Sequence, residues 1–138
     1  MIDQPTAEAI LGFSTKPGLS AAVGGTASMK KLDGCVYESL ASGSLGYDVV
    51  QVSAQIGAAM LGATKARLAA EGASVSPFDP GIANSTGFTQ KLPHGVDSQI
   101  WLLVGDRLIS VASTRKDGDV AKSRAAAVAA AQKLAASA

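Results

Sequence analysis

The strongest constraint on the fold of this chain is the order of segments with strand-like and helix-like periodicity along the sequence. Two groups of short segments are predicted to be β-strands. Residues in the first group point alternately to two faces with a period of two, and the run Ile100–Val104 in the second group is apolar on both faces, as in a central strand covered on both sides. The first group covers 35–41 and 47–53, and the second covers 86–92, 96–104 and 107–113. Because short Gly-containing turns join the segments within each group, we expect each group to form antiparallel hairpins.

Helical signals separate and flank these hairpins. A short helix is predicted over 5–13, a long one over 54–71 with Gly72 after its last turn, and a third over 120–135. Hairpins with helices between them are typical of α+β domains. We therefore predict a single α+β domain over 1–138, with a mostly antiparallel five-stranded sheet and the element order α-β-β-α-β-β-β-α.

Small residues dominate the chain and limit how its core is built. Alanine occupies 26 positions, against three Phe, two Tyr and one Trp. Since alanine buries little area, we expect a thin, closely packed core with helices lying tightly on the sheet. Gly57 and Gly62 weaken the second helix by about 1 kcal/mol each relative to alanine. Their expected role is to let that helix approach the sheet.

Two long connections are predicted to be irregular. The segment 16–28 is rich in Gly, Ser and Ala and has no periodicity. The segment 73–85 contains Pro77 and the sequence Asp79-Pro80-Gly81, which is typical of turns. Long loops often carry function, so 73–85 is a candidate interaction loop.

Charge and cysteine content exclude several classes of protein. The formal net charge is +1, which provides no large positive field for nucleic acid. Two interpretations apply to the cationic residues near the last helix, a small basic patch or a solvated face screened by salt; these residues are Arg115, Lys116, Lys122 and Arg124. One cysteine, Cys35, excludes an intrachain disulfide and a multi-cysteine zinc site, and we expect it to be a small buried residue. No segment is apolar enough over its length to predict a transmembrane span.

Catalytic motifs are not evident. The lone histidine, His94, lies in a predicted turn and is expected to be exposed. No serine occupies a Gly-x-Ser-x-Gly elbow, and the glycine-rich segment 23–26 lacks the following Gly-Lys-Ser/Thr of a phosphate-binding loop. We therefore predict no catalytic residue, no metal-ligand set and no cofactor.

Trp101 is the most informative single side chain, because it lies in the middle of the most apolar strand. Core packing is one interpretation. The alternative is that Trp101 forms the wall of an apolar pocket between sheet and helix, because a thin alanine-rich helix leaves room there for a ligand. The residues predicted to share that pocket are Met60, Phe78, Phe88 and Tyr47.

Several short motifs resemble a group of actinobacterial exported proteins with a PsbP-like fold. The group includes small lipoproteins and the extracellular sensor domains of mycobacterial serine/threonine kinases. The matching motifs are Leu11-Gly12, Gly34-Cys35-Val36-Tyr37, Ala69-Ala70-Glu71-Gly72, Pro80-Gly81-Ile82-Ala83 and Val104-Gly105-Asp106-Arg107. The resemblance implies an extracytoplasmic location and a binding or sensing role without catalysis. Relatives often carry paired cysteines, whereas Cys35 is alone.

The leading functional hypothesis is a non-enzymatic exported domain that binds a small apolar ligand or a protein partner. One alternative is a hydrolase or cyclase, which would need Tyr37, Tyr47, His94 or Asp48 to converge. Another is an inhibitory or interaction module that uses the 73–85 loop. Export would require a leader before residue 1, and the sequence leaves a cytoplasmic location open.

Overall fold

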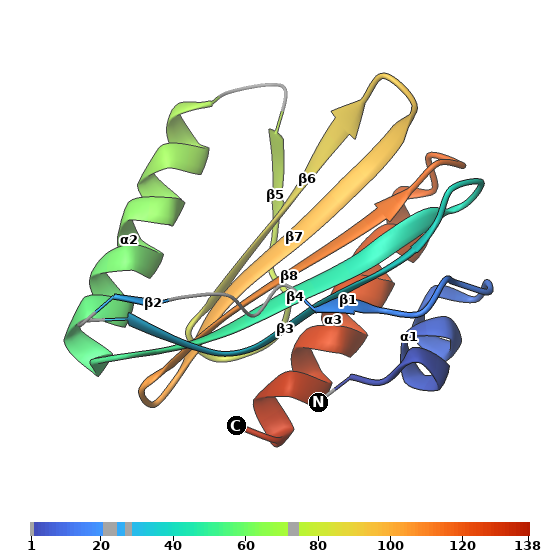
Figure 1. Cartoon of the computed structure of the whole chain (residues 1–138). Helices are drawn as coiled ribbons and strands as arrows, with labels where there is room; N and C mark the ends of the chain where they lie inside the picture. Colours follow the sequence, from blue (N-terminus) through green and yellow to red (C-terminus); the bar gives the residue numbers. More distant parts are fainter. Residues whose placement is uncertain (1, 21–24, 27–28, 72–74) are drawn as a thin grey trace.

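The structure is a computed structural model that describes residues 2–20, 25–26, 29–71 and 75–138 (Figure 1). Within these residues the chain forms three α-helices and eight β-strands. The helices are α1 (Gln4–Leu11), α2 (Ala54–Ala70) and α3 (Val120–Ala136). The strands are β1 (Leu19–Ser20), β2 (Gly25–Thr26), β3 (Met29–Ser39), β4 (Gly43–Val52), β5 (Val75–Phe78), β6 (Ser85–Leu92), β7 (Gly95–Val104) and β8 (Arg107–Arg115).

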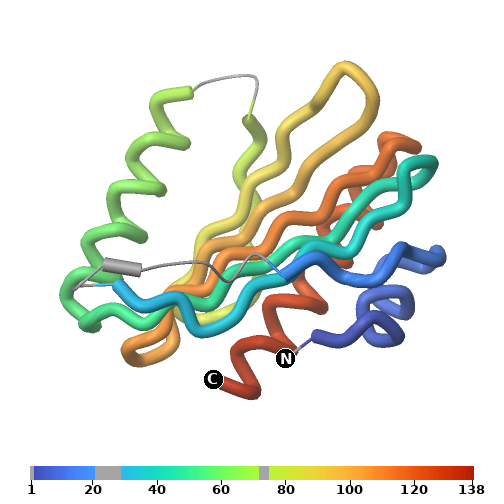
Figure 2. The backbone as a smooth tube through the Cα atoms, in the orientation of Figure 1, coloured from blue at the N-terminus to red at the C-terminus, as the bar shows by residue number. Residues whose placement is uncertain are grey.

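All described strands belong to one antiparallel sheet. Its order is β1-β3-β4-β8-β7-β6-β5, and β2 pairs with β3. The predicted five-stranded sheet and the predicted element order are therefore wrong, although the chain is α+β. Four strands precede α2 and four follow it, so each half contains strands that the sequence pattern does not reveal. The backbone tube shows the blue helix α1 near the red helix α3, with the green helix α2 apart from both (Figure 2).

The missed strands are short and lie near the edges of the sheet. β1 and β2 have two residues each, which is too short to show any alternation within the predicted loop 16–28. β5 lies within the predicted loop 73–85 and contains Pro77, which pairs with Phe88. An edge strand tolerates proline, because one side of it needs no ladder hydrogen bonds. Gly72, the predicted end of α2, lies outside the described residues.

The two faces of the sheet differ in what covers them. In β7, Ile100 and Leu102 are buried on one face, whereas Gln99 and Trp101 are half-buried on the other. The face of Ile100 packs against α3 and α1, and we call it the α3 face. The opposite face is contacted by α2, and we call it the Trp101 face (Figure 1).

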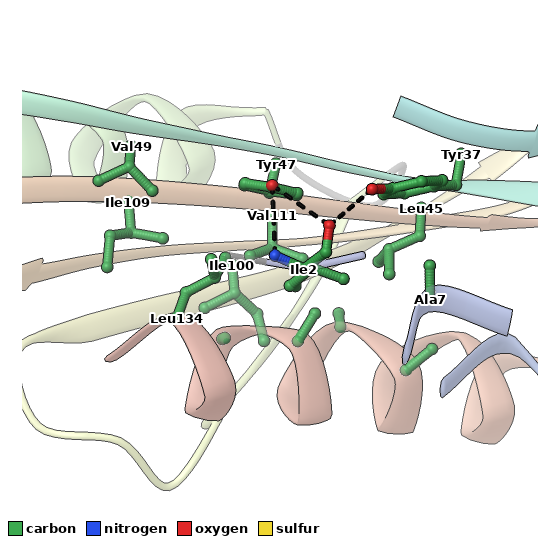
Figure 3. Close-up of a cluster of buried hydrophobic side chains, with 14 of the residues drawn as sticks. Ile2, Ala7, Tyr37, Leu45, Tyr47, Val49, Ile100, Ile109, Val111 and Leu134 are labelled. Carbon is green, nitrogen blue, oxygen red and sulfur yellow. Dashed lines mark hydrogen bonds between the residues drawn. The ribbon is translucent and has the colours of Figure 1, made fainter. Parts of the chain in front are cut away.

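The alanine-rich helix α3 lies directly on the α3 face. Ala127, Ala130 and Ala131 are each 0% exposed, and Leu134 reaches the same core as Ile100 (Figure 3). Alanine lets a helix approach the sheet closely, because its side chain is a single methyl group and the sheet side chains can reach near the helix backbone. The close packing expected from the alanine content is thus found at this layer.

A chain of buried hydroxyl groups also joins α3 to the sheet. Ser123 Oγ lies 2.9 Å from the Ser113 carbonyl oxygen and 2.8 Å from Ser98 Oγ. Thr89 Oγ1 lies 3.2 Å from Ser98 Oγ, and Arg124 Nε donates to it at 2.8 Å. A hydroxyl carries one hydrogen, and the carbonyl can only accept. Each group therefore donates to the next in one order: Arg124 to Thr89, Thr89 to Ser98, Ser98 to Ser123, and Ser123 to the carbonyl of Ser113.

Arg115 fastens α1 to the end of β8. Its Nη1 donates to the Leu11 carbonyl at 2.9 Å, and its Nε and Nη2 donate to the two carboxylate oxygens of Asp117 at 3.1 and 2.8 Å. The guanidinium also lies 5.6 Å from the centre of the Phe13 ring. These hydrogen bonds from Arg115 hold the pKa of Asp117 at about 2, so the pair is ionised at neutral pH.

The two glycines of α2 have different roles. A Cβ at Gly57 would lie 2.5 Å from Leu103 Cδ1 and 3.1 Å from Val52 Cγ2, so the predicted close approach to the sheet is confirmed there. A Cβ at Gly62 would meet nothing within 4 Å, so the same prediction is wrong for Gly62. Gly62 is exposed on the solvent side of the helix.

We expect Gly62→Ala to stabilise the protein by about 0.5–1 kcal/mol, because alanine has the better helix propensity and no collision follows. Gly57→Ala should bring no such gain, because Leu103 has to move. Urea unfolding of both variants, followed by circular dichroism, measures the difference. A Gly57→Ala protein more stable than Gly62→Ala would contradict this account of α2.

Candidate functional site

A hollow of 240 Å³ lies on the Trp101 face of the sheet. We call it the Trp101 hollow. The residues of this face that line it are Val36, Gly46, Asp48, Gln99, Trp101, Ser110 and Ala112. They come from the four neighbouring strands β3, β4, β8 and β7, so the hollow is built on the middle of the sheet.

Strand register explains why the sheet is hollowed here. Gly46 and Ala112 are direct neighbours on β4 and β8, so two adjacent positions of the floor have almost no side chain. Larger groups stand on both sides, since Val36 on β3 pairs with Gly46, and Trp101 on β7 pairs with Ser110. A floor of small residues between larger walls produces the depression.

Helix α2 leaves this part of the face open. Near its start, Gly57 lies against Leu103 at the end of β7. Farther along the helix, Leu68 packs with Val75 and Phe88, and Trp101 borders that cluster. The indole therefore stands at the boundary between the core under α2 and the hollow.

The polar groups of the hollow are held by neighbours on the sheet. Lys31 Nζ lies 2.7 Å from Asp48 Oδ1, as an ion pair without hydrogen-bond alignment. Gly34 makes room for this carboxylate, because a Cβ there would lie 2.6 Å from Asp48 Oδ1. The amide nitrogen of Gln99, a residue that lines the hollow, donates to Asp97 Oδ2 at 2.8 Å.

Trp101 carries an unusual polar group for its position. Its indole Nε1 is buried and has no hydrogen-bond partner among the described residues. A buried donor without a partner typically costs about 1–3 kcal/mol. Most buried donors are paired, so this N–H is an exception that calls for an explanation.

The five residues predicted to share a pocket divide between the two faces. Trp101 and Phe88 lie together on the Trp101 face, and Met60 is half-buried on α2. Phe78 packs toward the α3 face, where Arg124 stands 4.8 Å above its ring centre. Tyr47 points its ring into the α3-face core, and only its backbone borders the hollow (Figure 3). Successive residues of a strand point to opposite faces, so these side chains are separated by the sheet. The sequence alone does not show which face of the sheet a helix leaves uncovered.

The Tyr47 and Tyr37 hydroxyls form hydrogen bonds with the backbone of Ile2 in the core. Tyr37 Oη donates to the Ile2 carbonyl at 2.6 Å, and Tyr47 Oη accepts from the Ile2 N–H at 3.3 Å (Figure 3). Tyr47 Oη also donates to Asp33 Oδ2 at 3.1 Å. Burial raises the pKa of Tyr47 to about 12 and raises that of Tyr37 further. Both phenols are therefore neutral groups that hold Ile2 in place.

The four residues that the enzyme alternative requires do not converge. His94 is exposed in the β6–β7 turn, and Asp48 lies on the Trp101 face, opposite Tyr37 and Tyr47. Cys35 is half-buried beside the Tyr37 ring and has no disulfide partner. No group of three potential metal ligands was found in the described parts of the chain.

The suggested basic cluster is also not a free patch. Arg115 is buried and paired with Asp117, and Arg124 is engaged with Thr89. Lys116 Nζ donates to the Leu40 carbonyl. Lys122 lines a cavity and forms no ion pair with another described residue.

The strongest candidate site was missed at sequence level except for Trp101. Gly46, Ala112 and Gln99 carry no chemical signal of their own, and only the pairing of distant strands makes them neighbours. Comparisons with models of known protein families, with curated proteins and with solved structures found no match. Within the described residues, no helix has the length and apolarity that a bilayer crossing needs. The resemblance to PsbP-like exported domains stays a prediction.

Proposed function

We propose that this chain is a non-catalytic binding domain that takes a small, flat and largely apolar ligand in the Trp101 hollow. The observation that carries the proposal is the position of Trp101, half-buried at the wall of a depression with a floor of small residues. Aromatic walls beside small residues suit a ring, because the indole provides a large flat contact area.

The size and polarity of the hollow limit the ligand. At 240 Å³ it lies below the usual range of about 300–1,000 Å³ for drug-sized ligands. One or two fused rings therefore suit it better than a long chain. The Asp48 carboxylate, whose buried Oδ1 accepts no hydrogen bond from the described residues, favours a ligand with a hydrogen-bond donor on one edge.

The single tryptophan makes the proposal directly testable. A ¹H–¹⁵N spectrum contains one indole N–H signal, and it belongs to Trp101. Phenol, naphthol, benzamide and cyclohexanol would be titrated one at a time. We expect the aromatic compounds to shift this signal in a saturable way and cyclohexanol to shift it less, because only a flat ring stacks on the indole.

Two alanine variants separate binding in the hollow from other causes of a shift. Ala112→Leu places a side chain in the hollow and should abolish the response. Ala69→Leu, at an exposed position of α2, makes the same chemical change elsewhere and should leave it intact. If no compound shifts the indole signal, or if the shift is equally large in Ala112→Leu, the proposal is refuted.

We also propose that the domain is exported, on the basis of its resemblance to PsbP-like exported proteins. A fusion of the native gene to alkaline phosphatase, which is active only outside the cytoplasm, would test it. An inactive fusion that accumulates in the cytoplasm would remove the exported location and leave the binding site unaffected.

A further inference from the structure

A second and larger cavity lies between α1 and α3, on the other side of the sheet from Trp101. This groove has a volume of 610 Å³. We call it the α1/α3 groove. Ala9 and Ile10 of α1 and Ala125 and Ala129 of α3 provide apolar parts of its lining. The volume falls within the range of sites for small molecules.

Two lysines stand along the groove on α3. Lys122 and Lys133 both line it, and both are exposed. They are eleven residues apart, which is close to three helical turns, so they lie on the same side of α3 about 16 Å apart. Neither forms an ion pair with another described residue.

Acidic groups near the groove are already engaged by other donors. The Asp117 carboxylate is held by Arg115, and Asp119 accepts from the Lys122 backbone N–H at 3.0 Å as the N-cap of α3. Asp3 accepts from the Thr6 N–H at 2.9 Å as the N-cap of α1. No described acidic side chain lines the groove itself. Asp117 lies close enough to Lys122, and Asp3 to Lys133, for their charges to attract, but neither pair is within ion-pair distance. The two ammonium groups therefore remain available for direct contact with an external anion.

The shape of the groove favours a small ligand over a partner helix. α1 has eight residues and thus forms a wall only about 12 Å long. None of the described residues that line the groove is aromatic, in contrast to the anchor pockets of most protein interfaces. An alkyl chain needs only a narrow apolar channel, and alanine methyl groups provide one.

We propose that the α1/α3 groove binds an anionic single-chain amphiphile. Its alkyl chain lies on the floor formed by Ala9, Ile10, Ala125 and Ala129. Its carboxylate, sulfate or phosphate head lies at Lys122 or Lys133. This proposal is independent of the Trp101 hollow, because the two sites are on opposite faces of the sheet.

Isothermal titration with dodecanoate, below its critical micelle concentration, tests the groove. Dodecyl sulfate and dodecyl phosphate serve as alternative head groups, and dodecyltrimethylammonium reverses the head charge. We expect saturable binding of the three anions and little binding of the cation. In Lys122→Glu/Lys133→Glu the dissociation constant should rise by about tenfold, since repulsion replaces attraction.

Matched controls assign the binding to the groove. Lys65→Glu/Lys91→Glu makes the same charge change at exposed lysines outside the groove and should leave affinity unchanged. Ala129→Leu fills the groove and should abolish binding, whereas Ala121→Leu, exposed on α3 outside the groove, should not. Equal binding of the cationic amphiphile, or unchanged affinity in Lys122→Glu/Lys133→Glu, would overturn the proposal. The Trp101 indole signal should stay unchanged during these titrations, and a dodecanoate response seen only there would also overturn it.

Discussion

Gly43→Ala should destabilise the protein by at least about 3 kcal/mol. Gly43 begins β4 with a φ of +143°, a conformation that side-chain-bearing residues rarely adopt. A Cβ there would also collide with the carbonyl oxygen of Thr114 on β8. Backbone strain of about 1–3 kcal/mol therefore combines with a collision that only a shift of the sheet relieves.

Gly95→Ala should have a similar effect for the same reason. Gly95 begins β7 with a φ of +144°, and a Cβ there would collide with the carbonyl oxygen of Arg115. The two glycines flank the end of β8, where Arg115 pairs with Gly43 on one side and with Val96 on the other. Either substitution therefore also disturbs the residue that fastens α1.

Chemical denaturation of Gly43→Ala, Gly95→Ala and Gly105→Ala provides the measurement. Gly105 also has a positive φ, of +60°, but a Cβ there would meet nothing within 4 Å. It therefore reports the conformational cost without the collision, about 1–2 kcal/mol. If Gly43→Ala loses no more stability than Gly105→Ala, the close approach of β4 to β8 is not essential.

Ala130→Leu is expected to cost about 3 kcal/mol and to loosen the contact between α3 and the sheet. Ala130 is 0% exposed and belongs to the α3-face core. Three added carbon atoms have no space there, so either the helix moves away or the side chains around it leave their preferred rotamers. Leucine has a good helix propensity, so the loss would come from packing and not from the helix itself.

Ala121→Leu is the matched control, because Ala121 is exposed on the same helix. A surface change of this kind should stay within about 0.5 kcal/mol of the parent protein. Thermal unfolding, together with the near-ultraviolet circular dichroism of the aromatic core, compares the two variants. Equal stability of Ala130→Leu and Ala121→Leu would show that α3 does not depend on small residues to reach the sheet.

Sequence periodicity located the long regular elements well. The three helices lie within a residue or two of their predicted positions, and the five long strands are all present, with β3 and β4 beginning earlier than predicted. Periodicity did not predict β1, β2 and β5. The two-residue strands β1 and β2 are too short to show alternation, and Pro77 in β5 is a turn signal in most sequences. Those strands exist because neighbouring long strands offer them hydrogen bonds.

The candidate sites were harder to predict, because each depends on contacts between distant segments. The apolar strand around Trp101 points to this residue as part of a pocket. The same reasoning predicts Tyr47 and Phe78 in that pocket, although they lie toward the other face of the sheet. The Trp101 hollow depends on the pairing of Gly46 with Ala112 across β4 and β8. The α1/α3 groove depends on how an eight-residue helix sits beside α3.

By itself, the sequence determined the three helices and the five long strands, and that small residues would bring the layers close, because these properties follow from local periodicity and side-chain volume. Only the tertiary structure decided which face α2 leaves open and which lysines lack partners. Periodicity tells that successive strand residues point to opposite faces, but register between strands far apart in the chain sets which side chains become neighbours.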